Sequence, residues 1–167
     1  SLHVALPIYT LTVDPALALG PISPYLFGTN YGPSHAIPAG RMPLVESAGF
    51  TALRFPGGAW TDTVDMQTFQ IDTLIAFSKQ VGAIPTISVR LLGGSPETAA
   101  NLVRYTNKEK KYGVVYWSIG NEPNLFTQLK QADYDYTIDH LNREWRAIAT
   151  AMKKADSSIK LIGQIGR

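Results

Sequence analysis

A glutamate directly after an apolar segment is the residue of this sequence best suited to proton transfer. Segment 114–119 is rich in apolar and aromatic residues, and Gly120, Asn121, Glu122 and Pro123 follow it. Pro123 has no N–H to donate, so strand pairing is expected to stop there. Glu122 is therefore expected at the C-terminal edge of a buried strand, where parallel α/β folds keep their active sites. A carboxyl group there can act as a general acid or base, but a Glu before Pro can also be a loop residue without chemistry.

A second candidate is Arg54, which lies between Leu53 and Phe55 in another apolar segment. A guanidinium that is buried in a sheet needs a partner. We expect that partner to be Glu122 or another carboxylate of an active site. The alternative is a surface arginine at the end of a strand.

Four aromatic residues follow or lie close to the ends of predicted strands: Tyr31, Trp60, Trp117 and Phe126. Rings at such an edge can stack on the faces of sugars. For Trp117, which precedes the edge by several residues, packing in the core is an equally good expectation.

Segments with strand propensity alternate with segments of helical periodicity, which predicts an α/β fold. The expected strands cover 26–31, 51–55, 83–92, 114–119 and 159–165, with an additional early strand over 9–13. Expected helices cover 42–48, the apolar face of 71–81 that stops at Gly82, a helix that Ser95 caps, and 134–152 with Asp133 and Asp135 at its start. The order is four strand–helix pairs and a fifth strand. The near-continuous apolar strands favour a parallel sheet that helices cover.

Composition excludes several classes of function. The net charge is only +2 and the basic residues are scattered, so no nucleic-acid partner is predicted. The sequence has no Cys, which excludes disulfides and thiolate metal sites, and its three His residues lack the spacing of metal ligands. No run of about 20 apolar residues predicts a membrane span. We expect a soluble protein, and the sequence leaves its compartment open, secretion included.

Three passages together resemble retaining glycoside hydrolases of the large (β/α)8-barrel clan, especially the arabinofuranosidase, β-xylosidase and heparanase-like families. They are PISPYLFGTN over 21–30, ALRFPGG over 52–58 and WSIGNEP over 117–123. In that clan they correspond to the entry into the first strand and to the ends of the second and fourth strands. Trp60 marks one departure, because an Asn commonly follows the paired glycines in these families.

The resemblance implies a role for each matching residue. Glu122 would be the general acid/base, Asn121 would bind the 2-hydroxyl of the sugar, and Arg54 would orient the nucleophile. Asn30, Tyr31 and Trp60 would contribute further substrate contacts. The implied partner is a carbohydrate, and this hydrolysis needs no cofactor or metal.

The nucleophile of these families is a second Glu at the end of the seventh strand, and no residue of this sequence matches it. A complete barrel takes about 250 residues, so the resemblance assigns 1–20 to an early strand and lead-in, and 21–167 to the N-terminal half of a barrel. We expect such a half to be inactive alone. Its open sheet edges predict a homodimer or higher oligomer, or a missing C-terminal half.

Two other functions stay open at this point. The chain could be a carbohydrate-binding or structural half-barrel without catalysis that self-associates. It could also be a nucleotide-binding α/β domain, although the absence of a Gly-rich phosphate loop after the first strand weighs against that interpretation.

Overall fold

Five parallel strands form the single sheet that the computed structural model shows among residues 12, 14–17, 20–32 and 37–163, the residues that it describes. The strands are neighbours in chain order: β1 (Gly28–Asn30), β2 (Ala52–Phe55), β3 (Ile84–Val89), β4 (Tyr116–Ile119) and β5 (Lys160–Ile162). Parallel strands in this order match the first five strands of a (β/α)8 barrel, and the predicted fold class, a partial barrel of α/β type, is confirmed. The early strand predicted over 9–13 lies, apart from Thr12, outside the described residues.

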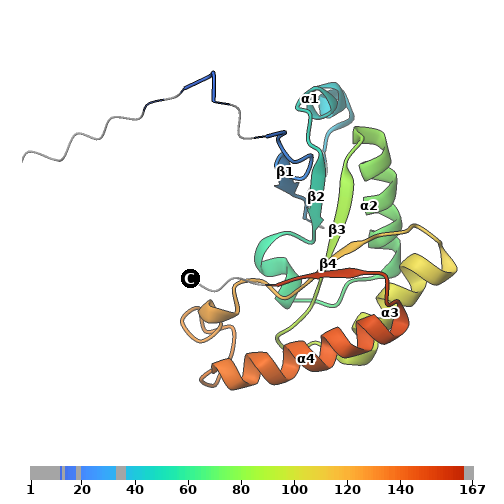
Figure 1. Ribbon diagram of the computed structural model, residues 1–167. Helices are drawn as coiled ribbons and strands as arrows, with labels where there is room; N and C mark the ends of the chain where they lie inside the picture. Colours follow the sequence, from blue (N-terminus) through green and yellow to red (C-terminus); the bar gives the residue numbers. More distant parts are fainter. Residues whose placement is uncertain (1–11, 13, 18–19, 33–36, 164–167) are drawn as a thin grey trace, which may run out of the picture.

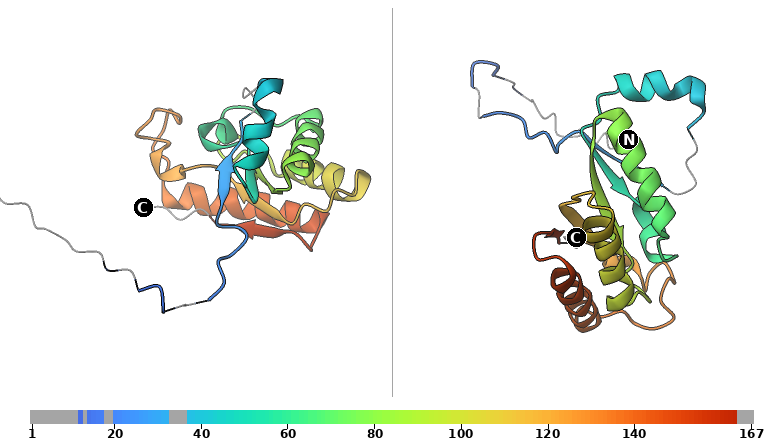
Figure 2. Two further views of the ribbon diagram at one scale, coloured as in Figure 1. Left: turned by 90° about the horizontal axis from the view of Figure 1, so that it is seen from above. Right: turned by 90° about the vertical axis from the view of Figure 1, so that its right-hand side faces the viewer.

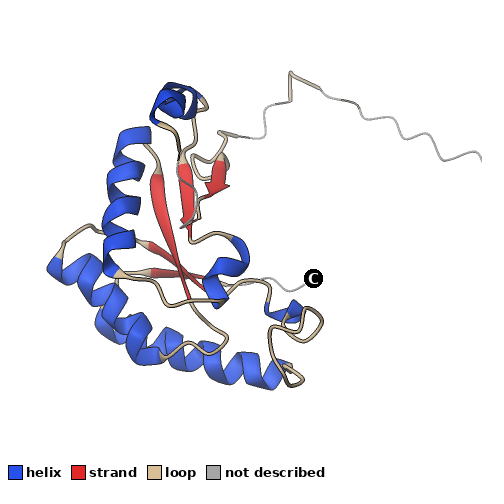
Figure 3. Cartoon of the chain, turned by 180° about the vertical axis from the view of Figure 1, so that it is seen from behind, coloured by secondary structure: helices blue, strands red, loops and turns tan. Residues whose placement is uncertain are grey.

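Helices connect successive strands and lie on one side of the sheet (Figures 1 and 3). They are α1 (Met42–Ser47), α2 (Thr68–Val81), α3 (Pro96–Val103) and α4 (Ile138–Ala155). Short helical turns supplement them: η1 (Ala39–Arg41), η2 (Gly58–Asp62), η4 (Pro123–Leu125) and the π-helical turn η3 (Arg104–Glu109). In Figure 3, α2, α3 and α4 form an outer layer and the strands lie inside it.

The core lies between the strands and this helical layer. Ile87 of β3, Leu74 of α2 and Met152 of α4 are fully buried. Trp117 is also fully buried, and its indole N–H donates to the carbonyl of Val114 at 3.0 Å. Trp117 is therefore a core residue rather than a surface for sugar stacking.

The observed helix and strand ends show where the sequence pattern was sufficient. Ser95 caps α3 as predicted, with its Oγ accepting from the amide of Thr98 at 3.0 Å, and Gly82 ends α2 in the left-handed conformation at φ 71°. The predicted start of α4 was wrong. Thr137 is the N-cap and exchanges hydrogen bonds with His140, so the helix begins only at Ile138. Tyr134, predicted as the first residue of its apolar face, precedes the helix together with Asp133 and Asp135.

A buried carboxylate ties together the N-terminal ends of β4 and β5. Asp156 accepts hydrogen bonds from Asn107 Nδ2 at 3.0 Å and from the Oγ of Ser158 at 2.7 Å, and it pairs with Lys108 at 3.1 Å. Asn107 also bonds both backbone groups of Val114. The Ser158 hydroxyl first, and then Asn107 and Lys108, hold the pKa of Asp156 well below its usual range against the opposing effect of burial.

Removing the side chain of Leu74 tests the core between α2 and the sheet. Leu74 is 0% exposed, so Leu74→Ala should lower the free energy of unfolding by about 2–5 kcal/mol in chemical denaturation, because it leaves a cavity. Phe69 on the same helix is 66% exposed, and Phe69→Ala is the matched control with a change within about 0.5 kcal/mol. Equal losses in the two variants would contradict this packing.

The depressed pKa of Asp156 predicts how stability depends on pH. Its stabilising contribution is present above the unfolded-state pKa of about 3.9 and is lost as the pH falls toward the lower native pKa. Asp156→Asn should therefore be less stable than the parent at pH 6, and the difference should shrink toward pH 2. Urea unfolding across this range measures it, and a difference independent of pH would oppose the assignment.

Candidate functional site

Glu122 lies just beyond the C-terminal end of β4, with an exposed side chain. Its backbone adopts the left-handed conformation with φ 47° and ψ 54°, which is uncommon for a residue other than Gly, Asn or Asp. Its carbonyl accepts from the amide of Leu125 at 2.8 Å and so begins the turn η4. The chain therefore turns sharply at Glu122, as expected from Pro123, and the carboxylate lies at the edge of the sheet.

Gly120 makes this turn possible. It has φ 75°, and a Cβ placed on it would lie 2.7 Å from the Cβ of Leu91. Its amide donates to the carbonyl of Val89 at 2.8 Å, which continues the pairing of β3 and β4 by one bond. A larger residue here would separate the ends of the two strands.

Arg54, Asn121 and Glu122, all predicted from sequence, meet at this edge. Arg54 Nη2 donates to Asn121 Oδ1 at 3.1 Å, and Asn121 Nδ2 donates to Glu122 Oε2 at 3.3 Å. The side-chain amide of Asn121 therefore links the cation to the carboxylate. Hydrogen bonds connect Arg54 to Glu122 through Asn121, and the charge of Glu122 also acts on the guanidinium.

A polar layer in the sheet holds Arg54 in place. Its Nε donates to Ser88 Oγ at 3.1 Å, and Ser88 Oγ and Ser118 Oγ are 2.7 Å apart. The two serines are buried and Arg54 is half-buried. Burial lowers the pKa of the Arg54 guanidinium, whereas the charges of Asp62 and Glu122 raise it.

Asp62 was not singled out from the sequence, and it occupies a central place in this site. It is 5% exposed at the end of η2. Its Oδ1 accepts from the amides of Leu91 and Leu92 at 2.9 and 3.2 Å, and its Oδ2 accepts from the amide of Asn121 at 2.7 Å. Burial raises the pKa of Asp62, and these amides together with the charge of Arg90 oppose that rise. The one available signal was an acid shortly after the passage 52–58, which also fits an ordinary loop residue.

The other three predicted substrate contacts lie around the ends of β1 and β2. Asn30 is exposed, and a groove of about 220 Å³ runs along it and Arg54. Trp60 in η2 is 44% exposed. The ring of Tyr31 stacks on Phe77 with centroids 4.7 Å apart, so much of its surface packs against α2. Contact of these residues with a sugar stays a prediction.

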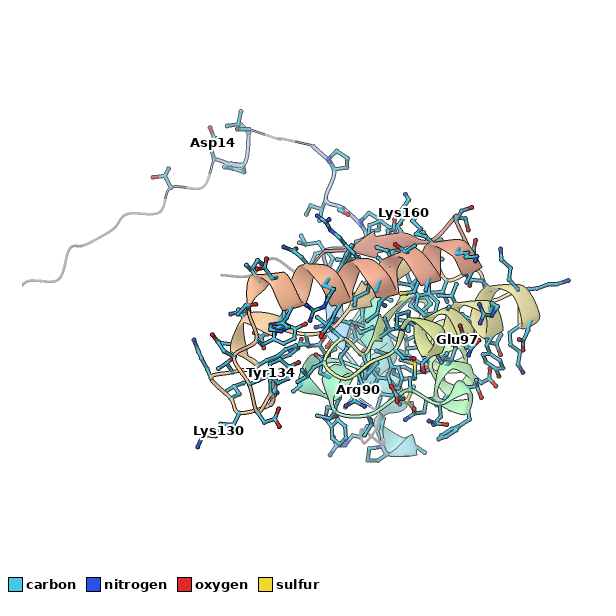
Figure 4. All side chains as sticks on the ribbon, turned by 90° about the horizontal axis from the view of Figure 1, so that it is seen from below. Asp14, Arg90, Glu97, Lys130, Tyr134 and Lys160 are labelled. Carbon is cyan, nitrogen blue, oxygen red and sulfur yellow. The ribbon has the colours of Figure 1, made fainter. Side chains whose placement is uncertain are left out.

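The segment between β4 and α4 lies at the N-terminal end of α4 (Figure 2) and carries further aromatic residues. Phe126 is fully buried and packs edge-on against Tyr136 at 5.0 Å. The hydroxyl of Tyr136 donates to Glu144 at 2.8 Å, and burial raises the pKa of Tyr136, with this carboxylate adding to the rise. In Figure 4, Tyr134 and Lys130 lie together on this segment, whereas Lys160 lies on β5.

The described part of the chain has neither a cluster of metal-binding side chains nor a helix suited to crossing a membrane. Its His, Asp and Glu residues form no group of three or more that could hold a metal ion. None of its helices has both the length and the apolar character needed to cross a membrane.

The chain is similar in sequence to a curated protein, the intracellular exo-alpha-(1->5)-L-arabinofuranosidase of Streptomyces lividans. The two are 24% identical over 90% of this chain and 31% of that protein. The chain thus spans about a third of the length of this relative. No protein-family model matches the sequence.

Solved glycosidases share the fold of the chain. A family 51 alpha-L-arabinofuranosidase from Bifidobacterium longum superposes with a TM-score of 0.60 at 19% identity, covering 83% of this chain and 38% of that one. A family 44 xyloglucanase from Paenibacillus polymyxa superposes with a TM-score of 0.63 at 13% identity, covering 88% and 42%. The alpha-L-arabinofuranosidase of Thermotoga maritima gives 0.57 at 20% identity, covering 72% and 32%. These matches confirm the resemblance to barrel-type glycoside hydrolases, over part of their length.

Contact between Gly57 and Asn30 gives a test of the site's geometry. A Cβ on Gly57 would lie 2.4 Å from the Cβ of Asn30, although the backbone of Gly57 suits any residue. Gly57→Ala should therefore displace Asn30 and lower the free energy of unfolding by about 1–3 kcal/mol. In Asn30→Gly the obstacle is gone, so the double variant should be more stable than the sum of the two single changes predicts.

The control for this pair is Gly40→Ala, because nothing lies within 4 Å of a Cβ there. Its free energy of unfolding, measured in urea, should stay close to that of the parent. Strict additivity of the Asn30 and Gly57 changes would show that the two residues do not touch.

Proposed function

We propose that this chain supplies the general acid/base of a retaining glycoside hydrolase, with Glu122 as the residue that transfers the proton. One observation carries the proposal: an exposed carboxylate follows β4 at the C-terminal edge of a parallel sheet, in hydrogen-bond contact with Asn121, which Arg54 holds in turn. Active sites of barrel enzymes lie at this edge.

The proposed reaction has two steps. In the first, Glu122 as the carboxylic acid gives its proton to the leaving oxygen while a second carboxylate attacks the anomeric carbon and the glycosidic bond breaks. In the second, Glu122 as the carboxylate takes a proton from a water molecule, and the water oxygen displaces the sugar from the second carboxylate. The anomeric configuration is retained, and Glu122 returns to its protonated form.

Asn121 suits a role in binding the sugar. Its Oδ1 accepts from Arg54, and one hydrogen of its Nδ2 points to Glu122. An amide NH₂ has two hydrogens, so the second is available to the 2-hydroxyl of the glycoside. Arg54 thereby fixes the orientation of Asn121 and adds positive charge beside the reacting centre.

We further propose that the attacking carboxylate comes from a segment outside this sequence or from another chain, so that this chain alone does not turn over glycosides. A retaining mechanism needs two carboxyl groups about 5–5.5 Å apart. Asp62 lies close to Asn121 but does not suit this role. It is 5% exposed, and both of its oxygens accept backbone hydrogen bonds.

An α-L-arabinofuranoside is the substrate that we propose to test first. The relatives with this fold include proteins described as arabinofuranosidases. The proposed chemistry uses two carboxyl groups and water, and it requires no cofactor.

A second candidate function is carbohydrate binding or self-association without catalysis. It is favoured by exposed apolar side chains at both outer strands, including Phe27 beside β1 at 55% and Ile162 on β5 at 43%, and by the exposed ring of Trp60. In this case the same edges that a barrel would close bind a second copy of the chain.

The acid/base assignment is tested by mixing this chain with the remaining barrel segment of a family 51 arabinofuranosidase. Hydrolysis of methyl α-L-arabinofuranoside should appear only in the mixture, and Glu122→Gln should lower kcat by about 10²–10⁴-fold. The loss should be smaller on the 4-nitrophenyl glycoside, because nitrophenolate leaves without a proton. Glu109→Gln, an exposed acid in η3 at the other end of the sheet, is the matched control and should retain activity.

Two outcomes would contradict the proposal. One is equal turnover by the Glu122→Gln and parent mixtures. The other is arabinan binding to the chain without turnover in any mixture, together with a dimer in light scattering, which supports the second candidate.

A further inference from the structure

Three backbone amides converge on the carboxylate of Asp62. Oδ1 accepts from Leu91 and Leu92, and Oδ2 accepts from Asn121 at 2.7 Å, the shortest of the three bonds. All three partners are donors, and an ionised carboxylate is the side chain that offers acceptors alone on both oxygens. An asparagine of the same shape presents an NH₂ group to at least one of these amides.

The three amides belong to two segments of the sheet edge. Asp62 itself ends η2, the turn that follows β2. Leu91 and Leu92 follow β3, and Asn121 follows β4. One buried side chain therefore connects the C-terminal ends of three adjacent strands at the edge where Glu122 lies.

Neighbouring hydrogen bonds give this connection a defined effect on Glu122. The amide of Gly120 donates to Val89, and the next amide, that of Asn121, donates to Asp62. Two consecutive amides are thus fixed just before Glu122, whose left-handed backbone is strained relative to the ordinary conformations of a residue other than Gly. A turn of this kind persists only where its surroundings hold it.

We propose that Asp62 is the positioning residue of the acid/base turn: its carboxylate fixes the backbone of Asn121 and thereby the direction in which Glu122 presents its carboxyl group. Asp62 acts through Asn121 and touches no reacting atom. Arg54 fixes the side chain of Asn121 and Asp62 fixes its backbone, so the residue is held from both sides. The consequence for catalysis rests on the proposed function, whereas the effect on the turn does not.

The direct test uses the unaltered protein in solution. A hydrogen bond between Asn121 N–H and Asp62 Oδ2 should give a scalar coupling across the bond in NMR, between the amide nitrogen of Asn121 and the carboxyl carbon of Asp62. The amide proton of Asn121 should also exchange slowly with solvent. Absence of the coupling, with fast exchange at Asn121, would overturn the proposal without any variant.

Asp62→Asn then separates positioning from general stability. The variant should shift the amide resonance of Asn121 and accelerate its exchange by at least tenfold beyond any change in global stability. Asp156→Asn is the matched control, because Asp156 is as deeply buried as Asp62, with 6% of its surface exposed. It accepts comparable hydrogen bonds at the opposite end of the sheet. This control variant should lower stability without this local change at Asn121, and an identical response in both variants would overturn the proposal.

A kinetic arm distinguishes failure of this proposal from failure of the proposed function. In the complemented enzyme, Asp62→Asn should lower kcat by about 10²-fold with little change in KM, because misplacement of a catalytic group by about 1 Å has such an effect. If the complemented parent is inactive, the NMR result still decides the positioning role. An active Asp62→Asn enzyme with unchanged kcat would overturn it.

Discussion

Asn121 is held by two opposite charges, and this constraint determines the geometry of the site. Arg54 donates to its side chain and Asp62 accepts from its backbone, and both charged groups are at least half-buried. A buried charge is stable only where polar partners replace water. Ser88 supplies such a partner for Arg54, and the amides of Leu91 and Leu92 supply them for Asp62. Both charges therefore depend on hydrogen-bonding groups near the C-terminal ends of β3 and β4. These bonds help to fix the position of the two strand ends relative to each other.

Much of the fold follows from patterns that act over short distances. The spacing of Ile71, Leu74 and Ile75 places one face of α2 in the core, and the cap at Ser95 begins α3 at the predicted residue. The parallel pairing of each strand with the next, from β1 through β5, follows from the alternation of strand and helix. The start of α4 was missed because the apolar residue Tyr134 fits the helical period, whereas the hydrogen bonds between Thr137 and His140 decide where the helix begins.

The residues of the site also differ in whether the sequence could reveal them. Glu122 and Arg54 could be found because each follows or interrupts an apolar strand, and the carboxyl ends of parallel strands meet at one edge. Asn121 was found through the resemblance of WSIGNEP over 117–123 to the glycoside hydrolase families. Asp62 could not be found, because its importance comes from three amides that lie about 29 and 59 residues away in sequence. The stacking of Tyr31 on Phe77 could not be found either, because Phe77 comes from α2, a helix distant from Tyr31 in the sequence.

The groups that hold the turn at Glu122 all come from β2, β3, β4 and the segments that follow them. Arg54 and Asp62 each bond Asn121, and Ser88 bonds both Arg54 and Ser118. None of these bonds uses β1 or β5. The outer strands are short and pair on one side only among the described residues, so disturbance of the sheet is expected to begin there. The turn at Glu122 is therefore protected from the edges by one strand on either side of the three that hold it. It follows that the direction of this carboxylate is set by hydrogen bonds within the chain itself.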